Sequence, residues 1–158
     1  MTEEQETYLL EHYPDLYWDR RKLEEDGSVT YDCSPYIWGF DIGEGWFNLI
    51  VELSDSLSQL VLEINKKEEN NSNLMNFKVC QIKEKFGGLR FNIGPVPEEY
   101  STQVHELISC AELKSFTICE VCGEKGSLRT DIGWIRTLCD KHYLEIDSIK
   151  KGRSAKTE

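Results

Sequence analysis

The strongest hydrophobic pattern of the chain lies in residues 45–65, where apolar side chains recur at spacings of three and four residues. This period is typical of an amphipathic helix, here of about five turns, whose apolar stripe needs a partner surface. Its members are Trp46, Leu49, Ile50, Leu53, Leu57, Leu60, Val61 and Ile64. A similar stripe predicts a helix over residues 97–115, and residues 3–13 predict a short helix that Pro14 ends.

Two β-prone runs on either side of Gly87 and Gly88 predict a hairpin over residues 77–94. A Gly-Gly pair supplies the positive φ angles that a two-residue turn requires, and this turn sets a register in which Phe86 faces Leu89. One face of the hairpin is then mostly apolar, and the other face is basic. The basic face carries Lys83, Lys85 and Arg90.

The remaining segments give weaker patterns. Residues 17–23 predict a second short helix or an ordered arm, and residues 36–41 predict a strand. Residues 116–118 are expected to be extended. Loops are expected at residues 24–28 and 66–73, where polar and charged residues gather.

Composition limits the class of protein. The chain has 158 residues, of which 39% are hydrophobic and 11% aromatic, enough for one domain with a real core plus a small appendage. It contains no apolar run of about 18 residues, so no membrane span is expected. The first residues lack the basic and apolar regions of a signal peptide, so we expect a cytoplasmic protein.

The charge is large and unevenly distributed. The net charge is −11, made up of −13 over residues 1–113 and +2 over residues 114–158. Because nucleic-acid phosphates are repelled by such an acidic surface, non-specific nucleic-acid binding is disfavoured. The same charge suits a protein partner with a basic face, although it also serves solubility alone.

Four residues near the C-terminus have the spacing of a zinc site. Cys119 and Cys122 form one pair, and 16 residues later Cys139 and His142 form a second pair. Three thiolates and one imidazole in two pairs are typical of tetrahedral structural zinc, with no position left open for catalysis. Two unrelated thiol pairs, or a redox Cys-x-x-Cys, are the alternative. Cys33, Cys80 and Cys110 are left over and are interpreted as buried free thiols in a reducing compartment.

The segment around these ligands resembles the treble-clef zinc finger. Gly123 allows a tight turn after the first pair, residues 128–138 predict a hairpin, and a helix starts at the second pair. The sequence therefore predicts an α+β fold in which a small antiparallel sheet packs with amphipathic helices, plus a C-terminal treble-clef-like zinc finger. The expected parts are an acidic helical N-terminal arm (1–30), an α+β core (31–115), the finger (116–148) and a flexible tail (149–158).

The basic hairpin face is a candidate ligand site. Arg90 can fork onto a phosphate or carboxylate, with Lys83 and Lys85 as point charges, and Gly87 and Gly88 would let a ligand approach the backbone. Salt bridges to acidic helices, or a solvated outer face, explain the same charges. A nucleotide bound through its phosphates and a contact with another protein both remain open.

Few residues in the sequence indicate catalysis. Asp41 and Glu44 lie beside glycines before the long helix, where they could serve acid–base chemistry or bind a divalent ion. Capping of that helix is the better explanation, because negative charges at its start favour the helix dipole. A metal-dependent nuclease or hydrolase would also need a histidine base, and only His12 and His105 lie outside the zinc set.

Three motifs together resemble a family of small phage and prophage proteins. They are the segment Trp38–Ile50, the segment Gln81–Phe91, and the finger with Gly133, Trp134 and the four zinc ligands. The resemblance covers roughly residues 35–143 and implies a phage context, in which such proteins are often dispensable accessory proteins, including inhibitors of host defence. We therefore expect a non-enzymatic binding protein whose partner is a host protein. Capture of a nucleotide at Lys83, Lys85 and Arg90 is the alternative.

Overall fold

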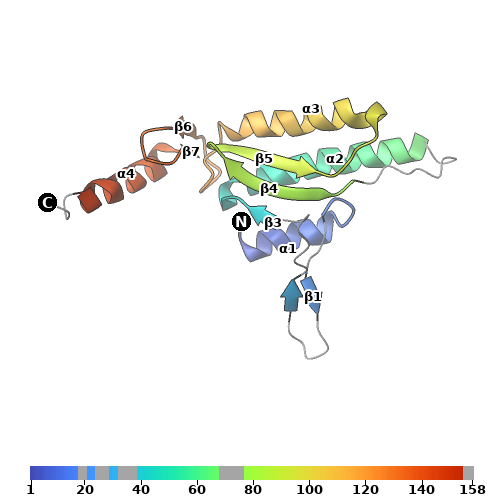
Figure 1. The fold of residues 1–158 in the computed structure, drawn as a ribbon, viewed down its shortest axis with the longest axis horizontal. Helices are drawn as coiled ribbons and strands as arrows, with labels where there is room; N and C mark the ends of the chain where they lie inside the picture. The colour runs from blue at the N-terminus through green and yellow to red at the C-terminus, as the bar shows by residue number, and fades with distance from the viewer. Residues whose placement is uncertain (18–20, 24–28, 32–38, 68–76, 155–158) are drawn as a thin grey trace.

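The structure, a computed structural model, describes residues 1–17, 21–23, 29–31, 39–67 and 77–154 (Figure 1). Helices and sheets occur in one chain without the regular alternation of a parallel α/β fold, which confirms the α+β class. In order, the elements are α1 (Glu3–His12), β1 (Arg21–Leu23), β2 (Val29–Tyr31), β3 (Gly39–Asp41), the 3-10 helix η1 (Glu44–Trp46), α2 (Phe47–Lys67), β4 (Val79–Lys85), β5 (Gly88–Ile93), α3 (Glu98–Ser115), β6 (Ser127–Arg129), β7 (Arg136–Leu138) and α4 (Asp140–Ser154).

The central sheet has three strands in the order β3-β4-β5. Strands β4 and β5 form the predicted antiparallel hairpin, whereas β3 joins β4 in parallel, so the sheet is mixed. Its inner face packs on α2 and α3, and β4 and β5 run alongside these helices (Figure 1). The three predicted helices are all present, and α2 carries the long apolar stripe.

The predicted turn of the hairpin is wrong. Phe86 and Gly87, not the two glycines, form it, with φ angles of 54° and 77°. Lys83 therefore faces Arg90, and the two strands are shifted by two residues from the predicted register. A shift of two preserves the faces, so the basic residues still share one side. Gly88 instead lies in β5, where a Cβ would be 2.3 Å from Cζ of Phe116.

The left-handed backbone of Phe86 gives a testable consequence. A non-glycine residue in this conformation costs about 1–3 kcal/mol, and Asn tolerates it better than Phe does. Because the Phe86 side chain is 63% exposed, little buried area is lost on replacement. We expect Phe86→Asn to raise the free energy of unfolding by about 1 kcal/mol in urea denaturation. A lower unfolding midpoint would contradict this account of the turn.

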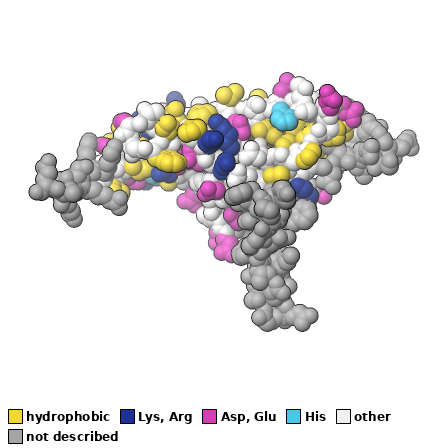
Figure 2. All heavy atoms as spheres, in the orientation of Figure 1, with side chains coloured by type: hydrophobic (Ala, Val, Ile, Leu, Met, Phe, Trp, Pro, Cys, Tyr) yellow, Lys and Arg dark blue, Asp and Glu magenta, His cyan; other side chains and the backbone are white. Residues whose placement is uncertain are grey.

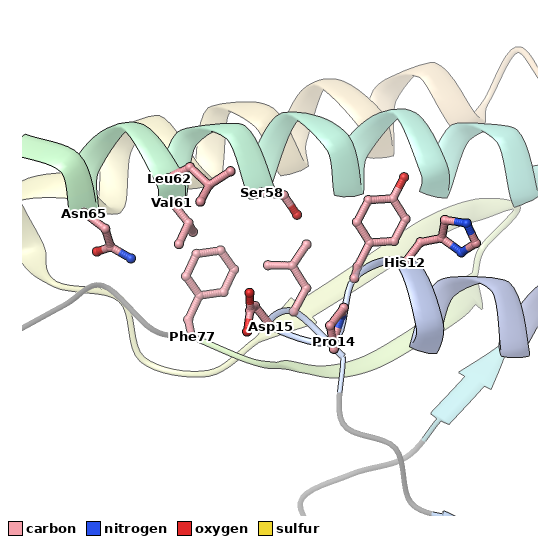
Figure 3. A pocket seen from close by; sticks show the side chains of 10 residues that line it. His12, Pro14, Asp15, Ser58, Val61, Leu62, Asn65 and Phe77 are labelled. Atoms are coloured by element: carbon pink, nitrogen blue, oxygen red, sulfur yellow. The ribbon is translucent and has the colours of Figure 1, made fainter.

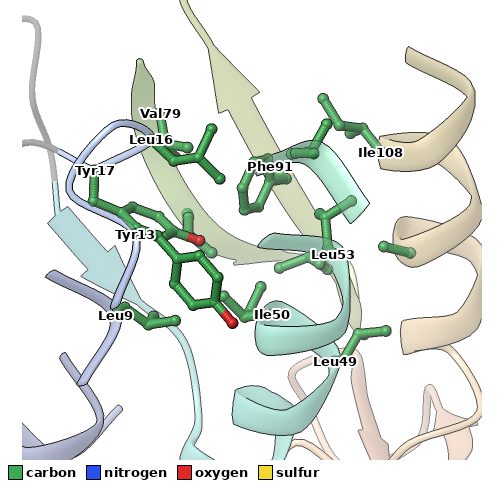
Figure 4. Packing of buried hydrophobic residues seen from close by; sticks show 14 of the residues in the cluster. Leu9, Tyr13, Leu16, Tyr17, Leu49, Ile50, Leu53, Val79, Phe91 and Ile108 are labelled. Carbon is green, nitrogen blue, oxygen red and sulfur yellow. The ribbon is translucent and has the colours of Figure 1, made fainter. Parts of the chain in front are cut away.

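One main core joins the N-terminal segment, α2, α3 and the sheet (Figure 4). Leu9, Tyr13, Leu16 and Tyr17 are all buried in it, so the helix predicted as part of an arm is integrated into the domain. The hydroxyl of Tyr17 lies 2.6 Å from Oγ of buried Ser54, which satisfies both polar groups.

The outer edge of β5 is closed by side chains of α3. The N–H of Leu89 donates to Oγ of Ser115 at 2.9 Å, and the N–H of Phe91 donates to Oε1 of Glu112 at 3.0 Å. These bonds satisfy edge groups that would otherwise be free to pair with another strand.

Other segments depart from the predictions. Residues 21–23 and 29–31 form the antiparallel pair β1-β2 rather than a second helix. Phe116 and Thr117 lie in a turn, not an extended segment, and α4 runs to Ser154, beyond the expected start of the tail. The loop at residues 24–28, most of the loop at 66–73, and residues 36–38 of the strand predicted at 36–41 lie outside the described residues, whereas residues 39–41 form β3 as predicted. In the part of the chain that is described, no helix combines the length and apolar character needed to span a membrane.

Candidate metal centre

A tight turn at residues 119–124, here called the knuckle, carries the first pair of ligands, Cys119 and Cys122. The N–H of Gly123 donates to the carbonyl of Cys119 at 2.8 Å, and the N–H of Cys119 donates to the carbonyl of Glu124 at 2.7 Å. Gly123 has a φ of 80°, a conformation that explains why glycine occupies this position.

The second pair lies where β7 meets α4. Cys139 directly precedes the helix and its carbonyl accepts from the N–H of Tyr143 at 3.0 Å, while His142 lies in the first turn. This is the predicted sequence of knuckle, hairpin and helix start. All four ligand atoms of Cys119, Cys122, Cys139 and His142 lie within 4.8 Å of one another.

The spacing of these atoms fits a small tetrahedral ion. Nδ1 of His142 lies 3.4 Å from Sγ of Cys119 and 3.2 Å from Sγ of Cys139, and the sulfurs of Cys122 and Cys139 are 3.9 Å apart. A tetrahedral zinc ion would set sulfur–sulfur distances of about 3.8 Å and sulfur–nitrogen distances of about 3.6 Å. Within the described residues, no other group of three or more His, Cys, Asp or Glu side chains could hold a metal ion.

The surrounding groups shift the pKa values of Cys119 and Cys122 in opposite directions. Burial by itself raises the pKa of Cys119, but the N–H groups of Cys139, Cys122 and Val121, together with His142, hold that pKa below its ordinary value. Burial, followed by the neighbouring cysteines, raises the pKa of Cys122. In the absence of metal, Cys119 therefore ionises before Cys122.

Metal affinity should consequently rise with pH around neutrality. Binding must remove the proton of Cys122, and each proton released makes the apparent affinity rise about tenfold per pH unit. As the pH falls toward acid, Cys119 also becomes protonated and the decline steepens. Competition with a chromophoric chelator across this range measures the slope, and an affinity independent of pH would contradict the assignment.

The knuckle packs directly on η1, the short helix that precedes α2. The N–H of Gly45 donates to the carbonyl of Glu120 at 3.0 Å, and Nε1 of buried Trp46 donates to the carbonyl of Ile118 at 2.9 Å. A Cβ on Gly43 would lie 2.0 Å from the oxygen of Glu120. Gly43 and Gly45 therefore allow the backbone before α2 to contact the backbone of the knuckle.

The finger also packs on the turn of the β4-β5 hairpin. Oγ1 of buried Thr137 donates to the carbonyl of Gly87 at 2.6 Å, and Nε1 of Trp134 donates to Oε2 of Glu84 at 3.1 Å. Gly87 and Gly88 are both buried at this junction. The space beside these glycines, where the sequence predicted that a ligand could approach, is thus filled by the chain's own finger.

A partly buried ion pair supports the same junction and was not predicted. The carboxylate of Glu120, only 5% exposed, accepts from Nε of Arg136 at 2.5 Å. Burial raises the pKa of Glu120, although Arg136 opposes this shift. Its second oxygen, Oε2, has no hydrogen-bond partner among the described residues. Nothing in the sequence indicated that these two residues would pair or that Glu120 would be buried.

The structure keeps Lys83, Lys85 and Arg90 on one side of the hairpin. Lys83 and Arg90 are direct cross-strand neighbours, and Asp41 of β3 lies opposite Lys83. Arg90 is partly engaged, with Nη1 donating to the carbonyl of Leu89 at 2.6 Å and lying 3.9 Å from Glu112. Lys and Arg side chains gather in the middle of the face shown in Figure 2.

The candidate catalytic residues do not form a cluster. Asp41 and Glu44 are exposed, and the N-cap of η1 is Gly43 without a side-chain hydrogen bond, so Asp41 does not cap it as predicted. Nδ1 of His12 lies 2.9 Å from the carbonyl of Tyr8, and Nδ1 of His105 lies 2.7 Å from that of Ser101. Each histidine thus contacts its own helix.

A cleft of about 400 Å³ between the end of α1 and the second half of α2 had no sequence signal (Figure 3). Its walls are mainly apolar and include Leu16, Val61 and Phe77, together with the polar residues Asp15 and Asn65. It forms only when distant segments meet, so no local motif marks it.

The fold and the site together define a small α+β domain with a C-terminal finger in which three cysteines and one histidine could hold a metal ion. Comparisons with family models, with curated proteins and with solved structures found no match to this chain.

Proposed function

We propose that this chain is a non-enzymatic binding protein whose finger is held in place by one structural zinc ion. The supporting observation is the closed Cys119, Cys122, Cys139 and His142 set, which leaves no position for a substrate. Three thiolates favour zinc over magnesium or calcium, which prefer oxygen ligands. The metal thus stabilises a surface rather than performing chemistry.

The biological role that we propose is that of a phage accessory factor that binds and modulates a host protein, in particular a defence protein. It rests on the three motifs that resemble phage proteins. The structure supplies a physical reason for these motifs to occur together, because the glycine segment before α2 and the hairpin turn are both packed against the finger. A protein built to keep one surface rigid needs all three.

Two measurements test this proposal. Elemental analysis of protein purified without added metal should find about one zinc per chain. Affinity purification from infected host cells should then recover a host protein with the wild-type chain but not with Cys139→Ala. Absence of near-stoichiometric zinc would refute the metal assignment. Metal-dependent turnover of a nucleotide or nucleic acid would refute the non-enzymatic role.

A further inference from the structure

Phe86, at the tip of the β4-β5 hairpin, combines an unfavourable backbone conformation with an unfavourably exposed aromatic ring. Its φ is 54°, where residues with a Cβ are uncommon, and its ring is 63% exposed. Turns of this kind normally carry Asn, Asp or Gly. A strained and exposed aromatic residue points to a role outside the fold of its own chain.

Two further exposed apolar side chains surround this tip, and both come from the finger. Leu128 is 45% exposed, and a Cβ on Gly87 would lie 2.4 Å from its Cδ1. Trp134 is 67% exposed and is fixed by its hydrogen bond to Glu84. Figure 2 shows hydrophobic side chains beside the central Lys and Arg group.

The loop that presents Trp134 is itself anchored. Ile132 is buried in the small core of the finger, and the hydroxyl of Tyr143 donates to Oδ2 of Asp131 at 2.6 Å. The indole ring is therefore held in position before any partner arrives, which lowers the entropic cost of binding.

Cations border these apolar side chains. Nζ of Lys85 lies 5.4 Å from the centroid of the Phe86 ring, and Lys83 shares the same sheet face. Neither lysine forms an ion pair with another described residue, in a protein of net charge −11. A local positive area on an acidic protein selects an acidic partner and repels basic ones.

We propose that Phe86, Leu128, Trp134, Lys83 and Lys85 form a docking surface, the tip–finger surface, for an acidic protein segment that carries an apolar anchor side chain. This inference rests on the proposed binding function and names its partner chemistry. The anchor covers Phe86 and Trp134, and the carboxylates of the segment meet the two lysines. Aromatic residues of this kind supply much of the affinity in protein interfaces.

A nucleic acid fits this surface less well. Asp41 lies beside Lys83, and Glu84 and Glu112 lie on the same hairpin and its covering helix. These carboxylates, together with the acidic net charge of the protein, repel a ligand that carries a phosphate at every nucleotide. A peptide can place its few carboxylates only where the lysines are.

The test selects binders of the metal-loaded full chain from a displayed library of random peptides. Enriched peptides are synthesised and titrated by fluorescence polarisation, with oligo(dT) and ATP titrated in the same buffer. We expect enrichment of Asp and Glu around Leu, Phe or Trp. Phe86→Asn, and separately the double variant Lys83→Glu with Lys85→Glu, should each weaken binding about tenfold or more.

Matched controls separate this surface from general effects. Leu62→Asn removes a similarly exposed apolar side chain on α2, and the double variant Lys66→Glu with Lys67→Glu makes the same charge change there; both should bind as the wild type does. Phe86→Asn should keep its metal and be at least as stable to heat as the wild type, so weaker binding would not reflect unfolding. Enrichment of neutral or basic peptides, no enrichment, comparable binding of oligo(dT) or ATP, or unchanged binding by Phe86→Asn would overturn the proposal. Peptide binding by a chain without zinc would instead refute the metal role alone.

Discussion

Removing the metal with a strong chelator should unfold the finger and lower the thermal stability of the whole chain. Its own buried cluster contains only Cys119, Ile132 and Leu138, which is too small to hold the segment together. Structural zinc sites contribute about 10–16 kcal/mol in finger peptides, comparable with the entire stability of a typical domain, about 5–15 kcal/mol. Without the cation, three crowded sulfurs and an imidazole remain with no shared partner.

The main core should survive this treatment in a weakened form, because its buried residues are contributed by α1, α2, α3 and the sheet. It loses the hydrogen bond from Trp46 to Ile118 and the contact between Thr137 and Gly87. Calorimetry with and without chelator should therefore show a lower transition temperature, and the emission of Trp46 should change as its indole N–H loses its partner.

A matched pair of cysteine variants identifies the source of this effect. Cys139→Ala should reproduce the result of chelation, whereas Cys110→Ala removes an exposed thiol on α3, outside the metal set, and should not. Identical unfolding curves with and without chelator would refute a stabilising metal. A loss of stability in Cys110→Ala equal to that in Cys139→Ala would show that the effect is not specific to the centre.

The features that sequence could predict are those that local spacing determines. The four metal ligands lie in two short pairs, and the apolar period of α2 is repeated often enough to be unambiguous. The prediction of the basic face of the hairpin was also unaffected by the incorrect register, because a shift of two residues leaves every side chain on its own face.

What sequence could not predict depends on contacts between distant segments. The glycines at 87 and 88 indicated a turn, yet Gly88 is required in the strand, where the Phe116 ring leaves no room for a Cβ. The parallel pairing of β3, the burial of Glu120 against Arg136 and the placement of α1 in the core are likewise set by tertiary neighbours. No window of adjacent residues contains that information.

Replacing Gly45 by alanine should be among the most damaging single changes outside the ligands. A Cβ there would lie 2.3 Å from the carbonyl oxygen of Cys119, 2.5 Å from the N of Gly123 and 2.7 Å from the N of Cys122. All three atoms belong to the backbone of the knuckle and cannot rotate away. We expect a loss of about 3 kcal/mol in the free energy of unfolding, together with weaker metal binding.

The direction of this effect distinguishes packing from backbone conformation. An alanine that fits its site stabilises a protein by about 0.4–1 kcal/mol relative to glycine, because it restricts the unfolded chain. Gly94→Ala is the matched control, since its Cβ would meet the oxygen of Lys78 at an ordinary 3.6 Å, and it should change stability by less than about 1 kcal/mol. Chemical denaturation and chelator competition on both variants measure the difference. If Gly45→Ala unfolds and binds metal as Gly94→Ala does, the knuckle is not packed on α2 in solution, and the metal centre and the core are independent.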